Sequence, residues 1–311
     1  KGDRVAGIVA NMPETIVLML ATTSLGAIWS SCSPDFGVES ILKRFSQIQP
    51  KVLVTVNGYY YKDKCIDTTD TVEGCLKGLS SVEHSVQIEY ISQDKQRIQK
   101  ATNPIHYLTD WLALDTPDPL TFLPVEFDHP VYIVYSSGTT GSPKCIVHGT
   151  GGVLLQHLKE LKLHCDLRRN DTLFYFTTTG WMMWNWLVSG LAVGATIVLY
   201  DGSPFYPEPD ALWQLAQDEE ITLFGTSASY LSHCQKSNLS PKDTYNLTSC
   251  RTILSTGGPL TEDSFDYIHS NISDSAQIAS ISGGTDILSC FVLGNPSLPV
   301  KRGRIQSRGL G

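Results

Sequence analysis

The chain has 311 residues, of which 41% are hydrophobic and 17% charged, so it can bury a large core and lacks the composition of a disordered protein. Its 23 Lys and Arg residues against 31 Asp and Glu residues give a net charge of −8 with no basic block, which disfavours nucleic acid and anionic membranes as partners. The eight cysteines stand singly, so zinc ribbons and thioredoxin-like chemistry lose support, and free thiols in a reducing compartment, the cytosol, are expected.

The first part of the chain alternates between short apolar runs and helical patterns. Strands are predicted at 5–10, 27–31 and 52–56, with helices at 14–25 and 39–48 between them. Pro13 stands at the start of the first helix, and Pro50 follows the second. A further strand is predicted at 86–90, in a less regular region that extends from 57 to 120. This alternation predicts βαβ units, and therefore an α/β fold with a mostly parallel sheet flanked by helices.

Four prolines between residues 115 and 130 predict a linker, so we expect a first lobe at 1–118 and a second α/β lobe at 119–311. In the second lobe, strands are predicted at 131–135, 145–148, 171–176, 195–200, 222–225, 252–254 and 277–281, and helices at 153–164, 210–218 and 263–269. The longest apolar stretch, 186–200, is interrupted by glycines and is too short to span a membrane, so it predicts a buried helix that runs into a buried strand.

The most informative segment is the loop Tyr135-Ser-Ser-Gly-Thr-Thr-Gly-Ser-Pro-Lys144. Its glycines permit positive φ and a close backbone approach to a ligand, its hydroxyls and exposed N–H groups can form an anion nest, and Lys144 adds a positive charge. Together these features suit a polyphosphate, although a solvated Gly/Ser hairpin is the alternative. The loop lacks the Walker A spacing and Pro143 opposes a helix after it, which disfavours a P-loop kinase or GTPase.

This loop is similar to the phosphate loop of the adenylate-forming acid–thiol ligases, the superfamily of acyl-CoA synthetases and luciferases, which reads Ser/Thr-Ser/Thr-Gly-Ser/Thr-Thr-Gly-x-Pro-Lys. Two further segments match in the expected order: Ser255-Thr-Gly-Gly-Pro-Leu260 resembles the turn that lines the adenine pocket, and Ser280-Ile-Ser-Gly-Gly-Thr-Asp286 resembles the family's Tyr-Gly-x-Thr-Glu segment. The resemblance implies the large domain of this fold, with two βα lobes. It also implies that Thr285 contacts the α-phosphate and that Asp286 holds Mg²⁺. Because Asp is one methylene shorter than the usual Glu, contact through water is favoured over direct contact with the metal.

The resemblance thus implies two catalytic residues, Lys144 and Thr285, and a nucleotide site made of Ser136, Ser137, Gly138, Thr139, Thr140, Gly141, Lys144, Gly257, Gly258, Pro259, Ser280, Ile281, Ser282, Gly283, Gly284 and Thr285. The histidines at 148, 157, 164 and 233 have no metal-ligand spacing and are expected to be structural.

More narrowly, segments 26–31, 33–37, 44–50, 180–186, 199–204 and 280–291 resemble the acetoacetate-activating branch of this superfamily. This resemblance implies ATP, acetoacetate and CoA as substrates and an acyl adenylate as the intermediate. It assigns Trp181, Met182 and Met183 to the acyl and CoA channel, with Trp184 and Trp186 as packing residues. The keto oxygen of acetoacetate needs a donor or a water in a buried site, so we expect Thr256 as the donor and Met182 as an adaptable wall of a pocket that also contains Gly283.

Two points of the pocket stay open. The Trp/Met run is also typical of a core helix. Gly283 stands where acetyl-CoA synthetases carry a pocket-closing Trp, so it can leave space for a longer acid, or it can serve backbone geometry beside Gly284.

The resemblance finally implies that this chain is most of a large nucleotide-binding domain, without the small C-terminal domain that carries a mobile catalytic Lys in this superfamily. The chain is therefore expected to be a piece of a longer ligase. The alternatives are a non-catalytic remnant that binds a nucleotide or an acyl group, and a ligase for another short-chain acid.

Overall fold

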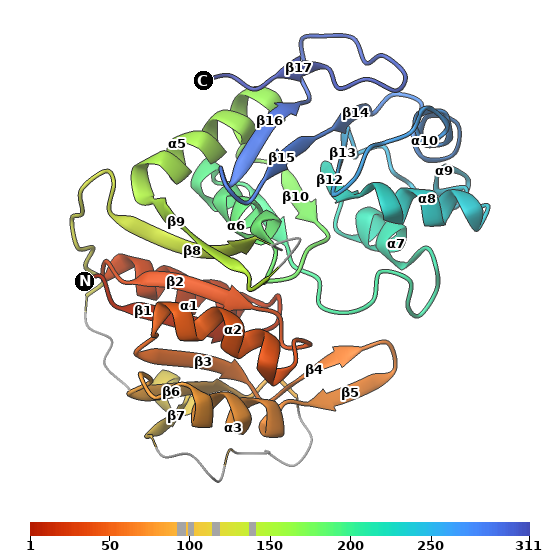
Figure 1. Cartoon of the computed structure of the whole chain (residues 1–311). Coiled ribbons are helices and arrows are strands. Elements are labelled where there is room, and N and C mark those ends of the chain that lie inside the picture. Colours follow the sequence, from red (N-terminus) through yellow and green to blue (C-terminus); the bar gives the residue numbers. More distant parts are fainter. Residues whose placement is uncertain (92–97, 99–102, 114–118, 137–140) are drawn as a thin grey trace. The chain divides into compact units, whose positions relative to one another are not determined.

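The structure is a computed structural model of the whole chain, and it describes residues 1–91, 98, 103–113, 119–136 and 141–311 (Figure 1). The chain forms two compact units. Unit 1 consists of Lys1–Val153 with Thr178–Trp181, and unit 2 consists of Leu154–Thr177 with Met182–Gly311.

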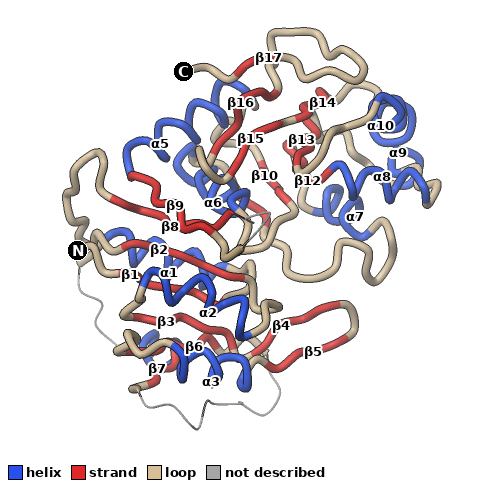
Figure 2. Tube along the Cα trace, in the orientation of Figure 1, coloured by secondary structure: helices blue, strands red, loops and turns tan. Residues whose placement is uncertain are grey.

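Unit 1 is built on a seven-stranded sheet with the order β7-β6-β3-β1-β2-β8-β9 (Figure 2). Every neighbouring pair is parallel except the β8–β9 hairpin. Its strands are β1 (Arg4–Ile8), β2 (Ile28–Cys32), β3 (Val52–Val56), β6 (His84–Ile88), β7 (Ile105–Tyr107), β8 (Pro130–Ser136) and β9 (Lys144–Gly149). Among the described residues, a two-stranded hairpin and four helices complete it: β4 (Gly58–Tyr61), β5 (Lys64–Asp67), α1 (Pro13–Ser24), α2 (Val38–Ile48), α3 (Thr69–Gly78) and α4 (Leu108–Leu112).

Helix α2 shows why the predicted pattern folds as it does. Its buried residues Ile41, Phe45 and Ile48 recur at helical spacing on the face that packs into the core of unit 1. The helix ends at Gln49, which takes the left-handed conformation with φ 47° and donates its N–H to the Phe45 carbonyl, and Pro50 prevents continuation.

The first sheet extends further along the chain than the prolines predict. Strand β8 pairs with β2 through Trp29 and Tyr132, so β8 and β9 belong to unit 1, and the change between units falls at Val153 rather than at residue 118. The region 57–120, in which only one strand is predicted, also contains β4, β5, α3, β7 and α4.

Unit 2 is built on a five-stranded parallel sheet with the order β11-β10-β12-β13-β14 and a small antiparallel sheet with the order β15-β16-β17. The strands are β10 (Thr172–Tyr175), β11 (Thr196–Val198), β12 (Leu223–Ser227), β13 (Thr252–Thr256), β14 (Gln277–Ser280), β15 (Ser282–Gly284), β16 (Ser289–Leu293) and β17 (Ser307–Arg308). The helices are α6 (Met182–Val188), α7 (Ala211–Asp218), α8 (Ala228–Lys236), α9 (Pro241–Thr244) and α10 (Glu262–Tyr267), with a 3₁₀ turn η2 (Ser189–Val193) and π-helical turns η1 (Glu160–His164) and η3 (Ile268–Ile272). Helix α5 (Thr150–Lys159) leads into η1.

Aromatic packing forms the centre of unit 2. The ring of Trp213 on α7 stacks on Phe224 of β12 with centroids 4.4 Å apart, and Phe224 in turn lies 5.2 Å from Phe174 of β10. All three side chains are fully buried, so α7 is held firmly against the parallel sheet. Both units therefore confirm the predicted α/β fold with mostly parallel sheets. Within the described part of the chain, no helix is long and apolar enough to cross a bilayer.

Candidate functional site

The predicted phosphate loop joins β8 to β9 in unit 1. Ser136 and Lys144 are partners across the hairpin, and they close a loop in which Ser137, Gly138, Thr139 and Thr140 lie outside the described residues. Because cross-strand partners present their side chains on the same face, the Ser136 hydroxyl and the Lys144 ammonium emerge on one side of the loop's base. The strand that follows Pro143 confirms that the loop does not open a helix.

A glycine conformation and one hydrogen bond shape the end of this loop. Gly141 has φ 135° with open space around its missing Cβ, so the position requires a glycine conformation rather than a small volume. Helix α2 supports the next turn, because Gln47 Nε2 donates to the Pro143 carbonyl at 2.9 Å. Lys144 is exposed, so its charge is available to a ligand at the loop.

The segment Thr178–Trp181 lies at the same edge of the sheet of unit 1. The Thr179 hydroxyl donates to the carbonyl of Val9, which follows β1, at 2.7 Å, and Ser31 of β2 donates to the Thr179 carbonyl at 2.7 Å. Since β1, β2 and β8 are parallel, their carboxyl ends share one edge, so half-buried Trp181 and the phosphate loop lie at the same end of one sheet. The sequence patterns did not single out Ser31 or Thr179, because both act through backbone contacts made by distant segments.

In unit 2 the structure brings the predicted adenine turn and the Ser280–Asp286 segment together. They follow the neighbouring parallel strands β13 and β14, in which Ser255 pairs with Ser280. The Ile281 N–H donates to the Ser255 carbonyl at 2.8 Å, and the Thr256 hydroxyl donates to the Ile281 carbonyl at 3.0 Å. The proton that Thr256 would offer to a keto oxygen is therefore already engaged within the protein.

The rest of the adenine turn has the backbone freedom that a flat ring needs. Gly257 has φ 82°, a conformation that favours glycine, and Gly257 and Pro259 are exposed while Gly258 is half-buried. Two fully buried hydroxyls that the sequence reasoning missed stand close by, at the carboxyl ends of β12 and β13. Thr226 Oγ1 and its register partner Ser255 Oγ have no hydrogen-bond partner among the described residues.

Thr285 and Asp286 lie in the tight turn between β15 and β16. The Leu288 N–H donates to the Thr285 carbonyl at 3.2 Å, and this bond closes the turn. Asp286 is exposed and Thr285 half-buried, while Ser280 and Ile281 are buried and Ser282 is exposed. The turn therefore offers the carboxylate of Asp286 to solvent.

Gly283 answers one of the open points of the acyl pocket. A Cβ at this position would lie 2.0 Å from the Ser289 carbonyl oxygen and 2.7 Å from the Cys290 Cα. The backbone of β16 thus occupies the space that a side chain would need, which contradicts the alternative that Gly283 leaves space for a longer acid. The glycine serves the close approach of two strands beside half-buried Gly284.

The Trp/Met run forms helix α6, and all seven of its residues are buried. Met182 is 7% exposed and Met183 3%, while Trp184 and Trp186 are 0% and 1% exposed, as packing residues would be. Trp186 donates from Nε1 to Glu160 Oε2 at 2.9 Å. The run therefore has the character of a core helix, and an acyl group would reach its methionines only at the start of the helix.

The histidines are held by ordinary contacts. His157 and His164 are buried and bonded to backbone carbonyls, and His233 packs on the ring of Phe205 at 4.1 Å. No group of three His, Cys, Asp or Glu residues that could hold a metal occurs within the described ranges. All eight cysteines are free thiols.

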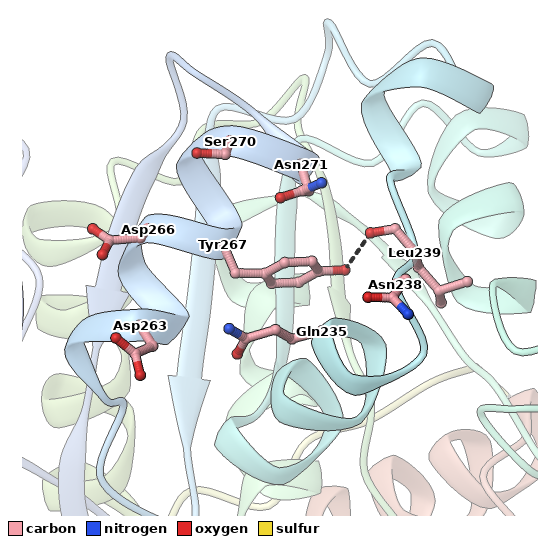
Figure 3. Close-up of a pocket in the computed structure, with 8 residues that line it drawn as sticks. All are labelled: Gln235, Asn238, Leu239, Asp263, Asp266, Tyr267, Ser270 and Asn271. Carbon is pink, nitrogen blue, oxygen red and sulfur yellow. Dashed lines mark hydrogen bonds between the residues drawn. The ribbon is translucent and has the colours of Figure 1, made fainter.

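A polar surface pocket of about 430 Å³ lies between α8 and the α10–η3 segment of unit 2 (Figure 3). Tyr267 crosses it and donates to the Leu239 carbonyl at 3.0 Å (Figure 3). None of the residues predicted for the nucleotide or acyl sites lines this pocket.

Nearly the whole chain matches a known family. The AMP-binding enzyme family matches residues 1–308. The chain belongs to the AMP-binding enzyme family. Its glycine-rich loop after β8 and the paired segments after β13 and β14 are thus parts of an AMP-binding enzyme domain.

Several similar proteins carry a more specific name. Two of them are acetoacetyl-CoA synthetases, one from Rhizobium meliloti with 52% identity over 310 residues and one from Gallus gallus with 48% identity over 314 residues. Each alignment covers 100% of this chain and 47% of the relative. A solved structure of acetoacetyl-CoA synthetase from Streptomyces lividans superimposes with a TM-score of 0.92 and 44% identity, over 99% of this chain and 47% of that one. This AMP-binding enzyme chain therefore spans about half the length of the relatives it matches.

Proposed function

We propose that the protein joins acetoacetate to CoA, with ATP as the energy source and an acyl adenylate as the intermediate. The observation that carries this proposal is the match of the entire chain to acetoacetyl-CoA synthetases at up to 52% identity. Its family and the placement of its glycine-rich loop add support, because both fit nucleotide chemistry. The free thiols favour the cytosol as its compartment.

The proposed reaction has two steps. The acetoacetate carboxylate attacks the α-phosphorus of ATP, so that a new C–O–P linkage forms and pyrophosphate leaves. The CoA thiol then loses its proton and attacks the acyl carbon, so that a thioester forms and AMP leaves. In both steps the substrates supply the nucleophile, and the protein supplies alignment and charge stabilisation.

Several groups are proposed to act in the first step. In unit 1, the proposed phosphate loop holds the β- and γ-phosphates by its N–H groups and hydroxyls, and Lys144 stabilises the charge that develops on pyrophosphate. In unit 2, the turn after β13 lines the adenine ring, and Thr285 donates to the α-phosphate. Trp181, Met182, Met183 and Thr256 are proposed to line the acyl pocket. Because the Thr256 hydroxyl already donates to Ile281 and a keto oxygen can only accept, Thr256 reaches that oxygen through a water that donates to both.

Mg²⁺ fits the residues present. This ion is commonly held by one or two carboxylates together with substrate phosphates, and Asp286 is an exposed carboxylate in the turn that carries Thr285. When bound, the ion would neutralise phosphate charge, and Asp286 would hold it directly or through a water.

The test is pyrophosphate release by the natural full-length protein with ATP and CoA, over a panel of short acids. We expect acetoacetate to have the highest kcat/KM. A higher value for acetate or butyrate would make the protein a ligase for another short acid. Nucleotide binding without pyrophosphate release for any acid would support the non-catalytic alternative and overturn the proposal.

A further inference from the structure

A buried carboxylate lies behind the turn that carries Thr285 and Asp286. Glu160, the first residue of η1, is 0% exposed. Its Oε1 accepts hydrogen bonds from the Cys290 N–H at 3.0 Å and from the Ser289 hydroxyl, and its Oε2 accepts from Trp186 Nε1 at 2.9 Å. Gln156, one turn earlier, also donates to Oε1 at 3.0 Å. The carboxylate therefore meets donors from three different segments of unit 2.

A buried imidazole supports the same turn from the same helix face. His157 precedes Glu160 by three residues, so both side chains project from one side of the α5–η1 helix. Its Nε2 lies 2.7 Å from the Leu288 carbonyl oxygen and its Nδ1 lies 2.8 Å from the Ser189 hydroxyl. Because a carbonyl can only accept, Nε2 carries a proton and donates to Leu288.

These contacts fall on three consecutive residues: Leu288, the last residue of the turn, and Ser289 and Cys290, the first two residues of β16. Leu288 has φ 50°, a conformation unusual for a branched side chain, and its N–H closes the turn on the Thr285 carbonyl. His157 holds the Leu288 carbonyl, and Glu160 holds the next two residues. The orientation of the turn is thus determined by polar contacts to α5 and η1 as well as by its own short hairpin.

We infer that Glu160 and His157 are positioning residues that set the place of Thr285 and Asp286 for adenylation, an inference that rests on the function proposed above. Both side chains are fully buried, so they act through the turn and not on the substrates directly. Glu160 also accepts a hydrogen bond from Trp186 of α6. One carboxylate therefore fixes the turn that carries Thr285 relative to α6, the helix that begins with Met182 and Met183.

The physical reason is that a buried charge is a poor means of gaining stability. Its desolvation offsets much of what its hydrogen bonds contribute, and well-packed apolar groups often serve stability equally well. Lys159 gives only partial compensation, because its Nζ lies 3.9 Å from Glu160 Oε1. The hydrogen bonds of the carboxylate instead fix the positions of the residues that donate to it. Such positions matter, because a displacement of ~1 Å at a reacting group can lower a rate by ~100-fold.

The test compares Glu160→Gln with Asp171→Asn in the natural full-length protein. In Glu160→Gln an amide NH₂ replaces one carboxylate oxygen. In one orientation this donor faces the Trp186 N–H, in the other it faces the Cys290 N–H, and either way one hydrogen bond is lost. Asp171 is the matched control: it is 8% exposed, binds Arg251 at 2.6 and 2.7 Å, and lies at the amino ends of β10 and β13, the opposite edge of the sheet.

Three measurements are made on each variant: the rate and KM of pyrophosphate release, the melting temperature, and hydrogen–deuterium exchange of residues 282–293 without substrate. We expect Glu160→Gln to lower kcat by about 10- to 100-fold with little change in the KM for ATP, and to speed exchange in 282–293. Asp171→Asn should lower the melting temperature at least as much while kcat and exchange in 282–293 stay unchanged. Equal loss of kcat in both variants, or unchanged exchange in Glu160→Gln, would overturn the inference.

Further variants keep the test decisive if Glu160→Gln does not fold. His157→Gln places an amide donor near the Nε2 position and should retain most of kcat, whereas His157→Leu should lose it; equal activity of the two would contradict the role of the Leu288 contact. If the unsubstituted protein shows no acetoacetate-dependent pyrophosphate release, the proposed function fails, whereas the exchange data still decide whether Glu160 and His157 hold the turn.

Discussion

Replacement of Lys144 by alanine tests the phosphate loop most directly. Lys144 is exposed at the first position of β9, and its ammonium makes no hydrogen bond or ion pair with any residue in the described ranges. A surface substitution of this kind changes the free energy of unfolding by less than about 0.5 kcal/mol. We therefore expect Lys144→Ala to fold normally and to show its effect on the reaction.

The size of that effect follows from the charge it removes. A hydrogen bond to a charged group contributes about 1.5–3 kcal/mol. Since each ~1.4 kcal/mol changes a rate tenfold, pyrophosphate release should slow by about 10- to 150-fold. The assay is acetoacetate-dependent pyrophosphate release by the full-length protein at saturating ATP, with urea unfolding to check stability.

Lys64→Ala is the matched control. Lys64 is likewise exposed and begins the second strand of an antiparallel hairpin, β4–β5, which carries no predicted ligand. Its loss should leave the rate unchanged. Equal rates for Lys144→Ala, Lys64→Ala and the unsubstituted protein would refute the assignment of the β8–β9 loop to the phosphates.

Gly141→Val should raise the KM for ATP through backbone strain of about 1–3 kcal/mol. Strain alone acts here, because φ is 135° and the space around the Cβ is open. An unchanged KM for ATP would contradict this prediction. Gly283→Ala should reduce kcat/KM for acetoacetate and for acetate by the same factor, since its Cβ would lie 2.0 Å from a backbone oxygen; a loss confined to acetoacetate would instead show that this position limits acid length. Gly225→Ala should lower the free energy of unfolding by about 1–3 kcal/mol, because its Cβ would lie 2.1 Å from the buried Tyr175 ring, and a urea midpoint that does not fall would disprove it. Burial raises the pKa of the Cys32, Cys75 and Cys250 thiols from 9.0 to about 12. Their contribution to the free energy of unfolding is therefore complete below pH 9 and is lost as pH rises toward about 12. Urea midpoints that stay constant over this pH range would contradict the effect.

Local patterns were sufficient where neighbours in sequence are neighbours in space. The spacing of Ile41, Phe45 and Ile48 predicts α2, and Pro13 and Pro50 predict where helices begin and end. The glycines, hydroxyls and proline before Lys144 likewise predict a loop that returns as a strand, because each acts through its own backbone or its adjacent residues.

Irregular local patterns hid other elements. Helix α3 and the β4–β5 hairpin are short, and the three buried apolar residues of α3, Val72, Cys75 and Leu76, are too few to distinguish a helix from the polar residues around it. Proline content suggested a boundary at residue 118, but a proline-rich connection does not reveal which sheet the next strand joins. The pairing of Trp29 with Tyr132 places β8 in the sheet of unit 1.

By itself, then, the sequence determined the α/β class, the family and the three segments that carry its motifs, since each depends on residue type and short-range order. Tertiary structure alone decided what surrounds them. The backbone of β16 fills the space beside Gly283, the Thr256 hydroxyl is engaged by Ile281, and Glu160 is fully buried in a helix whose charged residues would ordinarily face water. The physical reason is that burial and close approach are properties of several distant segments at once, and no single stretch of sequence contains them.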